Sequence, residues 1–434
     1  MLSLAVIGMG NRARKYLAYL QEHPDAFRVG AVVEPSEVHL EAAREQYGVP
    51  AEACFTSSEA FFAERRAVDA VLISSPDRSH FSQALQAASY GYHILLEKPS
   101  CEGVAELETL LEEVGRAGVV ACGCYVLRYH PLYRRLKALL EEGTIGTLRS
   151  VSHRVRIGRD RMCHSFVRGP WGSSRETSPI FLSKCCHDVD ILLWMTGVHP
   201  AEPASPGASA GFSGSSAGVS GVSSEGGLTF FCPEKAPEGA AERCLDCPLR
   251  ESCSWSATDL YLRRGLWTDS FFPLPGETKE EAVLREVRTG RYGRCAFHSG
   301  NDVADWQRVT VFTREGVTLD IEMDGLSPDE GRRTILTGTR GRIIADGAVI
   351  TVEPSLEPSL EAAPSCPPSC LSSRPSSRRI DLSAEAALPF HAGADFLLVD
   401  DFLHAVHDPS HTPLTALPST RDSLLVCFAA SLSL

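Results

Sequence analysis

Short apolar runs and helical patterns alternate along the first quarter of the chain. The apolar runs span residues 2–7, 29–33, 68–74 and 93–96, and amphipathic stretches lie between them. Short continuous apolar runs are typical of strands that are buried on both faces, and helices between such strands are typical of a parallel sheet. The pattern therefore predicts parallel strands linked by helices in this part of the chain.

A glycine-rich turn stands between the first apolar run and the first helical pattern. Its sequence is Gly8-Met9-Gly10-Asn11-Arg12-Ala13, a G-x-G-x-x-A motif. Gly8 permits the tight turn, Gly10 lets the backbone approach a pyrophosphate, and Ala13 allows the helix to pack closely on the strand. The helix N-terminus also presents free N–H groups to phosphates. In this context the motif predicts a dinucleotide site that includes Gly8, Gly10, Asn11, Arg12 and Ala13.

The second apolar run ends in an acidic residue, Glu34. A carboxylate at this position can accept hydrogen bonds from the ribose hydroxyls of NAD, and it repels the 2′-phosphate of NADP. No Lys or Arg follows Glu34 until Arg44. The sequence therefore predicts NAD as the cofactor, with NADP less favoured.

Polar turns follow the next two apolar runs. Ser75-Pro76-Asp77-Arg78-Ser79-His80 comes after residues 68–74, and Glu97-Lys98-Pro99 comes after residues 93–96. Ligands of doubly wound sheets bind outside the carboxyl ends of the strands. The predicted cofactor site therefore also includes Ser75, Pro76, His80, Glu97 and Lys98.

Lys98 is the first candidate for proton chemistry. The 42 basic residues comprise 36 Arg and six Lys, so a lysine is an unusual choice at a basic position of this chain. A lysine can lose its proton when burial and neighbours lower its pKa, whereas an arginine keeps its proton in proteins. The alternative is an ordinary surface lysine at a turn.

These motifs and three later ones, in order along the chain, carry a family resemblance. The later ones are Arg128-Tyr129-His130-Pro131, Gly143-Thr144-Ile145-Gly146, and His187-Asp188-Val189-Asp190 before Leu192-Leu193-Trp194. The chain resembles the Gfo/Idh/MocA oxidoreductases, named for glucose–fructose oxidoreductase and inositol dehydrogenase. The resemblance implies an α/β fold with an N-terminal Rossmann domain, here residues 1–122. The C-terminal α/β domain, residues 123–434, is expected to contain a large, mostly antiparallel, open-faced sheet.

The resemblance also implies partners and a role for one histidine. A nicotinamide cofactor and a sugar or cyclitol substrate are typical of the family. The sheet face without helices is expected to be apolar and to pack in a homodimer or homotetramer. By resemblance, His187 is the catalytic histidine that takes a proton from a substrate hydroxyl while a hydride leaves the same carbon. The alternative is that His187 caps its helix or pairs structurally with Asp190.

Further side chains are candidates for substrate contact. Many family members carry Asp four residues before this histidine, where the chain has Ser183. Lys184 and Asp190 are therefore the candidates to orient the imidazole. Arg128, Asn301, Asp302, His391 and Asp395 are weaker candidates, and for each a structural hydrogen bond or helix cap is the alternative.

Four cysteines in one loop-rich segment form the last candidate site. Cys232, Cys244, Cys247 and Cys253 lie within 22 residues, and the middle pair makes a C-x-x-C turn. This spacing suits a structural zinc ion, which four cysteines would close to substrate. An iron–sulfur cluster, disulfides or free thiols are the alternatives.

Composition limits the function classes. The net charge is −13 and no basic tract occurs, which disfavours nucleic acid and anionic membranes as partners. No apolar run approaches the roughly 20 residues that a membrane-spanning helix needs, and a cytoplasmic location is expected. Residues 201–227 and 354–379 are rich in Ser, Pro, Gly or Ala and are predicted to be surface loops.

Three functions remain from the sequence. The first is an NAD-dependent oxidoreductase that acts on a secondary hydroxyl of a sugar or cyclitol. The second is an NAD-dependent glycoside hydrolase that oxidises the sugar transiently before eliminating the aglycone. The third is a non-catalytic dinucleotide-binding sensor, which Lys98 and His187 argue against.

Overall fold

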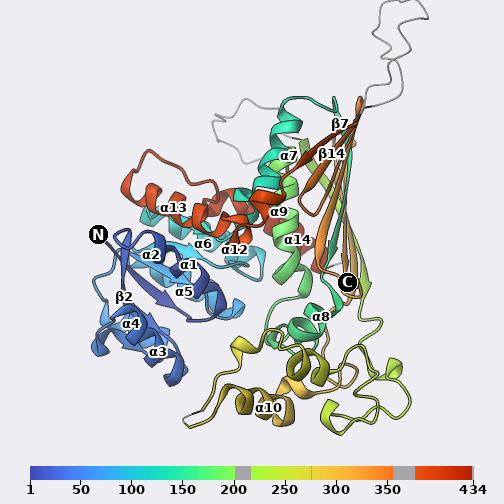
Figure 1. Ribbon diagram of the computed structural model, residues 1–434. Coiled ribbons are helices and arrows are strands. Elements are labelled where there is room, and N and C mark those ends of the chain that lie inside the picture. Colours follow the sequence, from blue (N-terminus) through green and yellow to red (C-terminus); the bar gives the residue numbers. More distant parts are fainter. Residues whose placement is uncertain (201–216, 275, 355–376, 433–434) are drawn as a thin grey trace, which may run out of the picture.

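The N-terminal domain is a parallel sheet with helices on both faces (Figure 1). The computed structural model describes residues 1–200, 217–274, 276–354 and 377–432. The strand order β3-β2-β1-β4-β5-β6 reverses direction at β1, which is where doubly wound sheets bind ligands. The strands are β1 Leu2–Ile7, β2 Phe27–Val33, β3 Cys54–Phe55, β4 Ala70–Ile73, β5 His93–Leu96 and β6 Ala121–Gly123. The helices are α1 Asn11–Leu17, α2 Tyr19–Glu22, α3 Glu37–Tyr47, α4 Ser58–Glu64, α5 His80–Ser89 and α6 Val104–Ala117.

The second domain is built on a nine-stranded, mostly antiparallel sheet in the order β15-β14-β13-β12-β7-β11-β10-β9-β8. The predicted α/β fold with two such sheets is confirmed. The strands are β7 Leu148–Arg156, β8 Val198–Pro200, β9 Ala217–Gly227, β10 Trp306–Thr313, β11 Thr318–Asp324, β12 Gly331–Gly338, β13 Gly341–Asp346, β14 Val349–Pro354 and β15 Arg378–Asp381. Helices α7 Pro131–Glu141, α9 Cys186–Thr196 and α14 Arg421–Leu432 cover the face that looks toward the first domain (Figure 1).

The outer face of the nine-stranded sheet carries charged side chains where an apolar surface was expected. Exposed and buried residues alternate along β7 and β10, as they do in a sheet with one solvated face. Arg154 pairs with Glu322 across 3.1 Å, and Arg308 with Asp320 across 3.6 Å. The expectation of a homodimer or homotetramer rested on an apolar face, so it loses this support and stays a prediction.

Part of the first predicted loop is a strand. Residues 217–227 form β9, which pairs antiparallel with β10 and sets Val222 opposite Val311. Val219 and Val222 pack against the core, so tertiary pairing overrides the Gly- and Ser-rich composition. Residues 201–216 and 355–376, which make up most of the two predicted loops, lie outside the described residues. Of the second predicted loop, the structure describes Pro354 at the end of β14 and residues 377–379, which include the start of β15.

Between β9 and β10 the chain makes a long excursion of short helical turns, residues 228–305. Its regular helix is α10 Lys279–Thr289, which begins at a capping box of Thr278 and Glu281. Other short helices elsewhere in the chain include α8 Arg159–Arg161, α11 Ser383–Ala386 and α12 Pro389–Ala392.

Helix α13, Ala394–His407, returns to the first domain. Phe402 of this helix lies beside Leu4, Tyr16 and Leu72 of the Rossmann domain. The predicted division after residue 122 falls inside β6, and the packing crosses it, because α13 completes the core of the first domain. No helix among the described residues is long and apolar enough to cross a membrane.

This packing predicts a large stability cost for truncating Phe402, which is 1% exposed. Phe402→Ala should lower the free energy of unfolding by about 3–5 kcal/mol, because it leaves a cavity between α13 and the sheet. The control is Leu397→Ala on the same helix, a position that is 44% exposed, with an expected change within about 0.5 kcal/mol. Urea denaturation measures both, and equal losses in the two variants would contradict this packing.

Candidate active site

The glycine-rich loop lies at the carboxyl end of β1 and approaches β4 closely. Gly8 has φ +90°, and a Cβ there would lie 2.8 Å from the backbone of Ser74. The Ser74 hydroxyl also donates to the Gly8 carbonyl across 2.7 Å. A Cβ on Gly10 would meet nothing within 4 Å. Gly8 is thus required by packing inside the protein, while Gly10 leaves the outer side of the turn open to a ligand.

The Glu34 carboxylate at the end of β2 reaches this loop. It accepts hydrogen bonds from the backbone N–H groups of Met9 (2.9 Å) and Ser36 (3.1 Å). The acid is therefore fixed at the edge of the glycine turn, beside the position that the motif assigns to a dinucleotide.

The Arg12 guanidinium forms ion pairs with acidic side chains of the protein itself. Its guanidinium pairs with Glu97 across 2.7 Å and with Asp395 of α13 across 2.6 Å, and it stacks over the ring of Tyr16. Burial by itself raises the pKa of Glu97, but the charges of Arg12 and Lys98 outweigh burial and hold that pKa below its usual range. The prediction that Arg12 binds the cofactor directly gains no support from these contacts, while Asn11 is exposed at the turn.

His80 joins the two polar turns at the ends of β4 and β5. Its Nδ1 lies 2.7 Å from the Pro99 carbonyl and its Nε2 lies 2.8 Å from the Ser75 carbonyl. The ring is 1% exposed, so both nitrogens face protein groups. The Ser75 hydroxyl donates to Gln83. These contacts brace the turns that carry Pro76 and Lys98.

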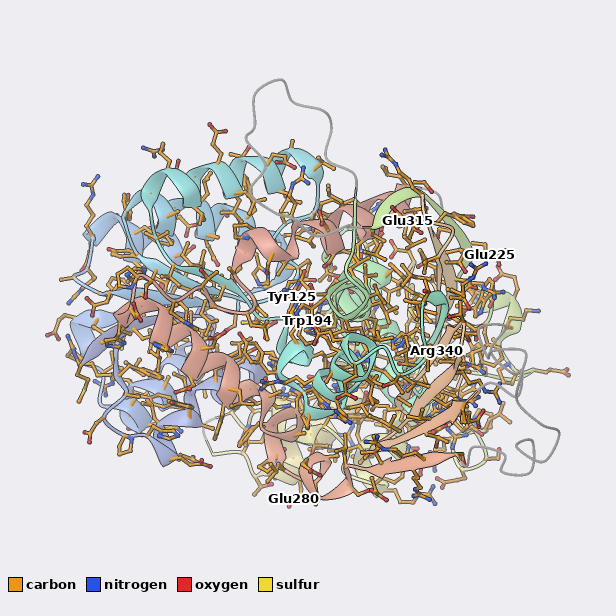
Figure 2. All side chains as sticks on the ribbon, turned by 90° about the horizontal axis from the view of Figure 1, so that it is seen from above. Tyr125, Trp194, Glu225, Glu280, Glu315 and Arg340 are labelled. Atoms are coloured by element: carbon orange, nitrogen blue, oxygen red, sulfur yellow. The ribbon has the colours of Figure 1, made fainter. Side chains whose placement is uncertain are left out.

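Lys98 and His187 meet between the two domains. Lys98 donates from Nζ to the carbonyl of Ser183 (2.6 Å), in the turn that leads into α9. The His187 ring meets Tyr125 edge-on at 5.7 Å, and among the described residues its buried Nδ1 has no hydrogen-bond partner. Tyr125 lies where the first domain meets the helices of the second (Figure 2). Burial, and then the charge of Lys98, holds the pKa of His187 well below its usual value, so the imidazole is neutral near pH 7.

Asp190 and Arg128 form a buried ion pair. The two carboxylate oxygens accept from the guanidinium at 2.6 and 2.7 Å, and Ser423 donates to the same carboxylate. Arg128 also donates to Leu414 and Ser419 near the C-terminus. These contacts support a structural role for the pair, and the roles of Asp190 in orienting the imidazole and of Arg128 in binding substrate stay predictions.

Lys184 lies three residues before His187 on the same turn. Burial, and then the charge of nearby Arg332, lowers its pKa to about 8. The Asp188 carboxylate is hydrogen-bonded to the His153 ring (2.9 Å) and forms an ion pair with Arg332. Lys184 is thus a lysine that can exchange a proton near pH 8.

Asn301 and Asp302 lie in the loop before β10. Asp302 accepts from the backbone N–H and the hydroxyl of Ser174, at 2.6 and 2.9 Å. Arg78 of the first domain donates to the carbonyl of the same Ser174. Asp302 therefore holds a loop against the first domain, while the side-chain nitrogen of Asn301 is buried without a partner among the described residues.

The backbone at His391 has an unusual conformation that sequence patterns could not reveal. Phe390, His391 and Ala392 have φ of 58°, 54° and 57°, a left-handed run of non-glycine residues. Such strain is typical of functional sites. His391 is fixed by Asp395 across 2.8 Å, and its charge acts on both His187 and His130. Burial first, and then His391, lowers the pKa of His130 to about 4.

The predicted cysteine cluster is only partly assembled. Cys244, Cys247 and Cys253 line one cavity together with Cys295, and Cys232 does not. Among the described residues, no three His, Cys, Asp or Glu side chains have the spacing to hold a metal ion as they stand.

Comparison with known proteins identifies the first domain. The family described as "Oxidoreductase family, NAD-binding Rossmann fold" (GFO_IDH_MocA) matches residues 2–124. YteT of Bacillus subtilis, named as an oxidoreductase, is 24% identical over 63% of this chain and 59% of its own length. Inositol 2-dehydrogenase of Streptomyces avermitilis is 29% identical over 45% of this chain and 54% of its own length. The matched part thus spans little more than half the length of these relatives.

Solved structures show the fold of the whole chain. An oxidoreductase from Agrobacterium radiobacter, solved with NAD+, L-tartaric acid and magnesium, has a TM-score of 0.64 at 14% identity. The comparison covers 100% of this chain and 96% of that one. At this identity the likeness concerns the fold.

The lowered pKa of Lys184 predicts how stability depends on pH. Between pH 8 and its unfolded value of 10.5, the unfolded chain binds a proton that the folded chain does not, so stability rises with pH. Relative to Lys184→Met, the wild type should gain stability over this range by at most about 1.4 kcal/mol per pH unit. Below pH 8 the difference should be constant. Urea denaturation at each pH measures it, and parallel curves throughout would contradict a buried Lys184.

Proposed function

Because the chain belongs to the Gfo/Idh/MocA oxidoreductase family, we propose that it moves a hydride from a secondary hydroxyl of a sugar or cyclitol to NAD. The carrying observation is that Lys98 donates to the carbonyl of Ser183, in the turn before His187, so that its charge acts on the His187 ring. The relationship to inositol 2-dehydrogenases supports the cyclitol class. When bound, the nicotinamide supplies the hydride acceptor.

His187 is the proposed proton acceptor. A neutral imidazole can take a proton from a substrate hydroxyl, and the pKa of His187 keeps it neutral near pH 7. Among the described residues its buried Nδ1 has no hydrogen-bond partner, so no protein hydrogen bond at that nitrogen fixes the tautomer of the ring. The T-shaped contact with Tyr125 restrains the orientation of the ring.

Lys98 is the proposed donor to the substrate oxygen. An ammonium has three donor hydrogens, and Ser183 takes one of them. A second can point at the oxygen from which the proton leaves, where it stabilises the developing negative charge. Glu97, anchored by Arg12 and Tyr16, fixes the backbone N–H of Lys98 across 3.1 Å and so limits where the ammonium can reach.

His391 is the proposed positioning residue on the substrate side. Asp395 holds one ring nitrogen, which leaves the other available for a polyol hydroxyl. Because Asp395 also pairs with Arg12, the position of His391 is tied to the glycine loop and to Glu97. His391→Gln should therefore raise KM for the substrate more than it lowers kcat, while the affinity for NAD stays unchanged.

Glu34 determines the expected cofactor preference. NAD should bind more tightly than NADP, because the carboxylate repels a 2′-phosphate. Glu34→Ser combined with Ser36→Arg should reverse the preference, as fluorescence titration with each dinucleotide would reveal. The matched control is Glu37→Ser at the start of α3, which should leave the preference intact. A wild-type protein that binds NADP tenfold more tightly, a difference of about 1.4 kcal/mol, would exclude this role.

Removal of either proposed chemical group should abolish most turnover. Lys98→Ala and His187→Ala should each lower kcat by about 10²–10⁴-fold and retain NAD binding. Lys137→Ala on α7 and His404→Ala on α13 are the matched controls and should keep wild-type rates.

The assay is NADH formation with a panel of sugars, cyclitols and aryl glycosides. Aglycone release without net NADH would instead indicate the glycoside hydrolase reaction. Normal turnover in His187→Ala would move the proton acceptor elsewhere, with Lys184 the next group to test.

A further inference from the structure

Four cysteines line one small cavity in the excursion between β9 and β10. Cys244, Cys247, Cys253 and Cys295 share this cavity, which has a volume of about 20 Å³. Cys244, Cys247 and Cys295 are buried and Cys253 is half-buried. A space of this size holds one particle about as large as a water molecule. The site lies outside the catalytic cleft and plays no part in the proposed hydride transfer.

Contacts between two backbone segments place Cys295, the last of the four cysteines, near Cys244, the first. Arg243 and Arg294 form an isolated antiparallel bridge, and the Sγ of Cys244 lies 3.6 Å from the carbonyl of Arg294, the residue before Cys295. The backbone N–H of Cys247 donates to the carbonyl of Cys244 (3.3 Å), which closes the C-x-x-C turn. This turn is the arrangement that supplies two ligands of structural zinc sites.

Two hydrogen-bond donors lie around the sulfur of Cys244. The backbone N–H of Ala257 donates to its Sγ across 3.4 Å, and the guanidinium of Arg168 lies 3.8 Å from the same sulfur. Hydrogen bonds of this kind are typical of the groups that surround metal ligands and orient them.

Among the described residues, no acidic side chain pairs with Arg168, a buried cation. It is 3% exposed, and its hydrogen bonds go to the carbonyls of Arg294 and Trp255. Within the described residues its second terminal nitrogen, Nη1, is buried without any partner. A buried charge is costly unless an opposite charge balances it. Thiolates that bind a divalent cation keep a net negative charge, which would meet this need.

We propose that Cys244, Cys247, Cys253 and Cys295 bind one structural zinc ion, with Arg168 balancing the charge of the thiolates. Cys295 thereby replaces Cys232 of the set predicted from the sequence, since Cys232 does not line the cavity. The four thiols do not yet have ligand spacing in the structure, so the ion draws them together around the cavity. Four thiolates leave no open position, and the ion joins turns that have little regular secondary structure of their own.

Elemental analysis of the full-length protein, purified without chelators from zinc-supplemented cells, tests the proposal. The wild type should carry about one zinc per chain. Cys244→Ser, Cys247→Ser, Cys253→Ser and Cys295→Ser should each lose most of it. Cys232→Ser is the matched control and should retain it. Arg168→Met should weaken zinc binding by about 10–100-fold in a chelator competition, as expected for a residue next to the ligands.

Cobalt substitution provides a test that needs no variant. Wild-type protein exchanged with Co²⁺ should show the visible bands of tetrahedral cobalt thiolate. A metal-free wild type with all 15 thiols titratable after denaturation would overturn the proposal, as would bound iron or paired disulfides. Loss of zinc in Cys232→Ser but not in Cys295→Ser would overturn the proposed ligand set and favour the one predicted from the sequence, which has Cys232 in place of Cys295. NAD binding by the same samples is independent of all these outcomes.

Discussion

The ion pairs of Arg12 are the contact on which the arrangement of the cleft depends. Arg12 belongs to the glycine-rich motif. Its guanidinium pairs with Glu97, the residue before Lys98, and with Asp395 at the start of α13. It thereby links the cofactor loop, the candidate catalytic lysine and the helix that returns from the second domain. Buried pairs of this kind contribute little net stability when intact, but removing one partner leaves an uncompensated charge. Their value here lies in fixing three segments relative to one another.

Hydrogen bonding also distinguishes the buried charged groups that hold the fold from the group that is proposed to react. Asp190, Asp188 and Arg128 are buried and fully engaged with protein partners, so they hold α9 in place. His187 on that helix lacks such a partner at its buried nitrogen, and its pKa is lowered so that it stays neutral. The acids on α9 thus position the helix, while the histidine just before them remains free to accept a proton.

The sequence was sufficient for the parts of the fold and site that depend on local patterns. The apolar runs, the glycine motif and the acid at Glu34 all lie where their patterns predicted. Contacts between distant segments could not be predicted in this way. The Gly- and Ser-rich β9 becomes a strand because β10 pairs with it. The ion pair of Arg12 with Asp395, which is remote in sequence, also had no local signature. The left-handed backbone at His391 has no signature in residue type.

Isotope transfer tests the central claim, that Lys98 and His187 serve a hydride transfer to NAD, most directly. The full-length protein would be incubated with NAD and a panel of cyclitols and sugars deuterated at their carbinol carbons, and the dinucleotide analysed by mass spectrometry. The account predicts deuterium in the reduced nicotinamide for at least one polyol in the wild type, and none above background in His187→Ala. NAD that binds but gains no deuterium from any member of the panel would contradict it.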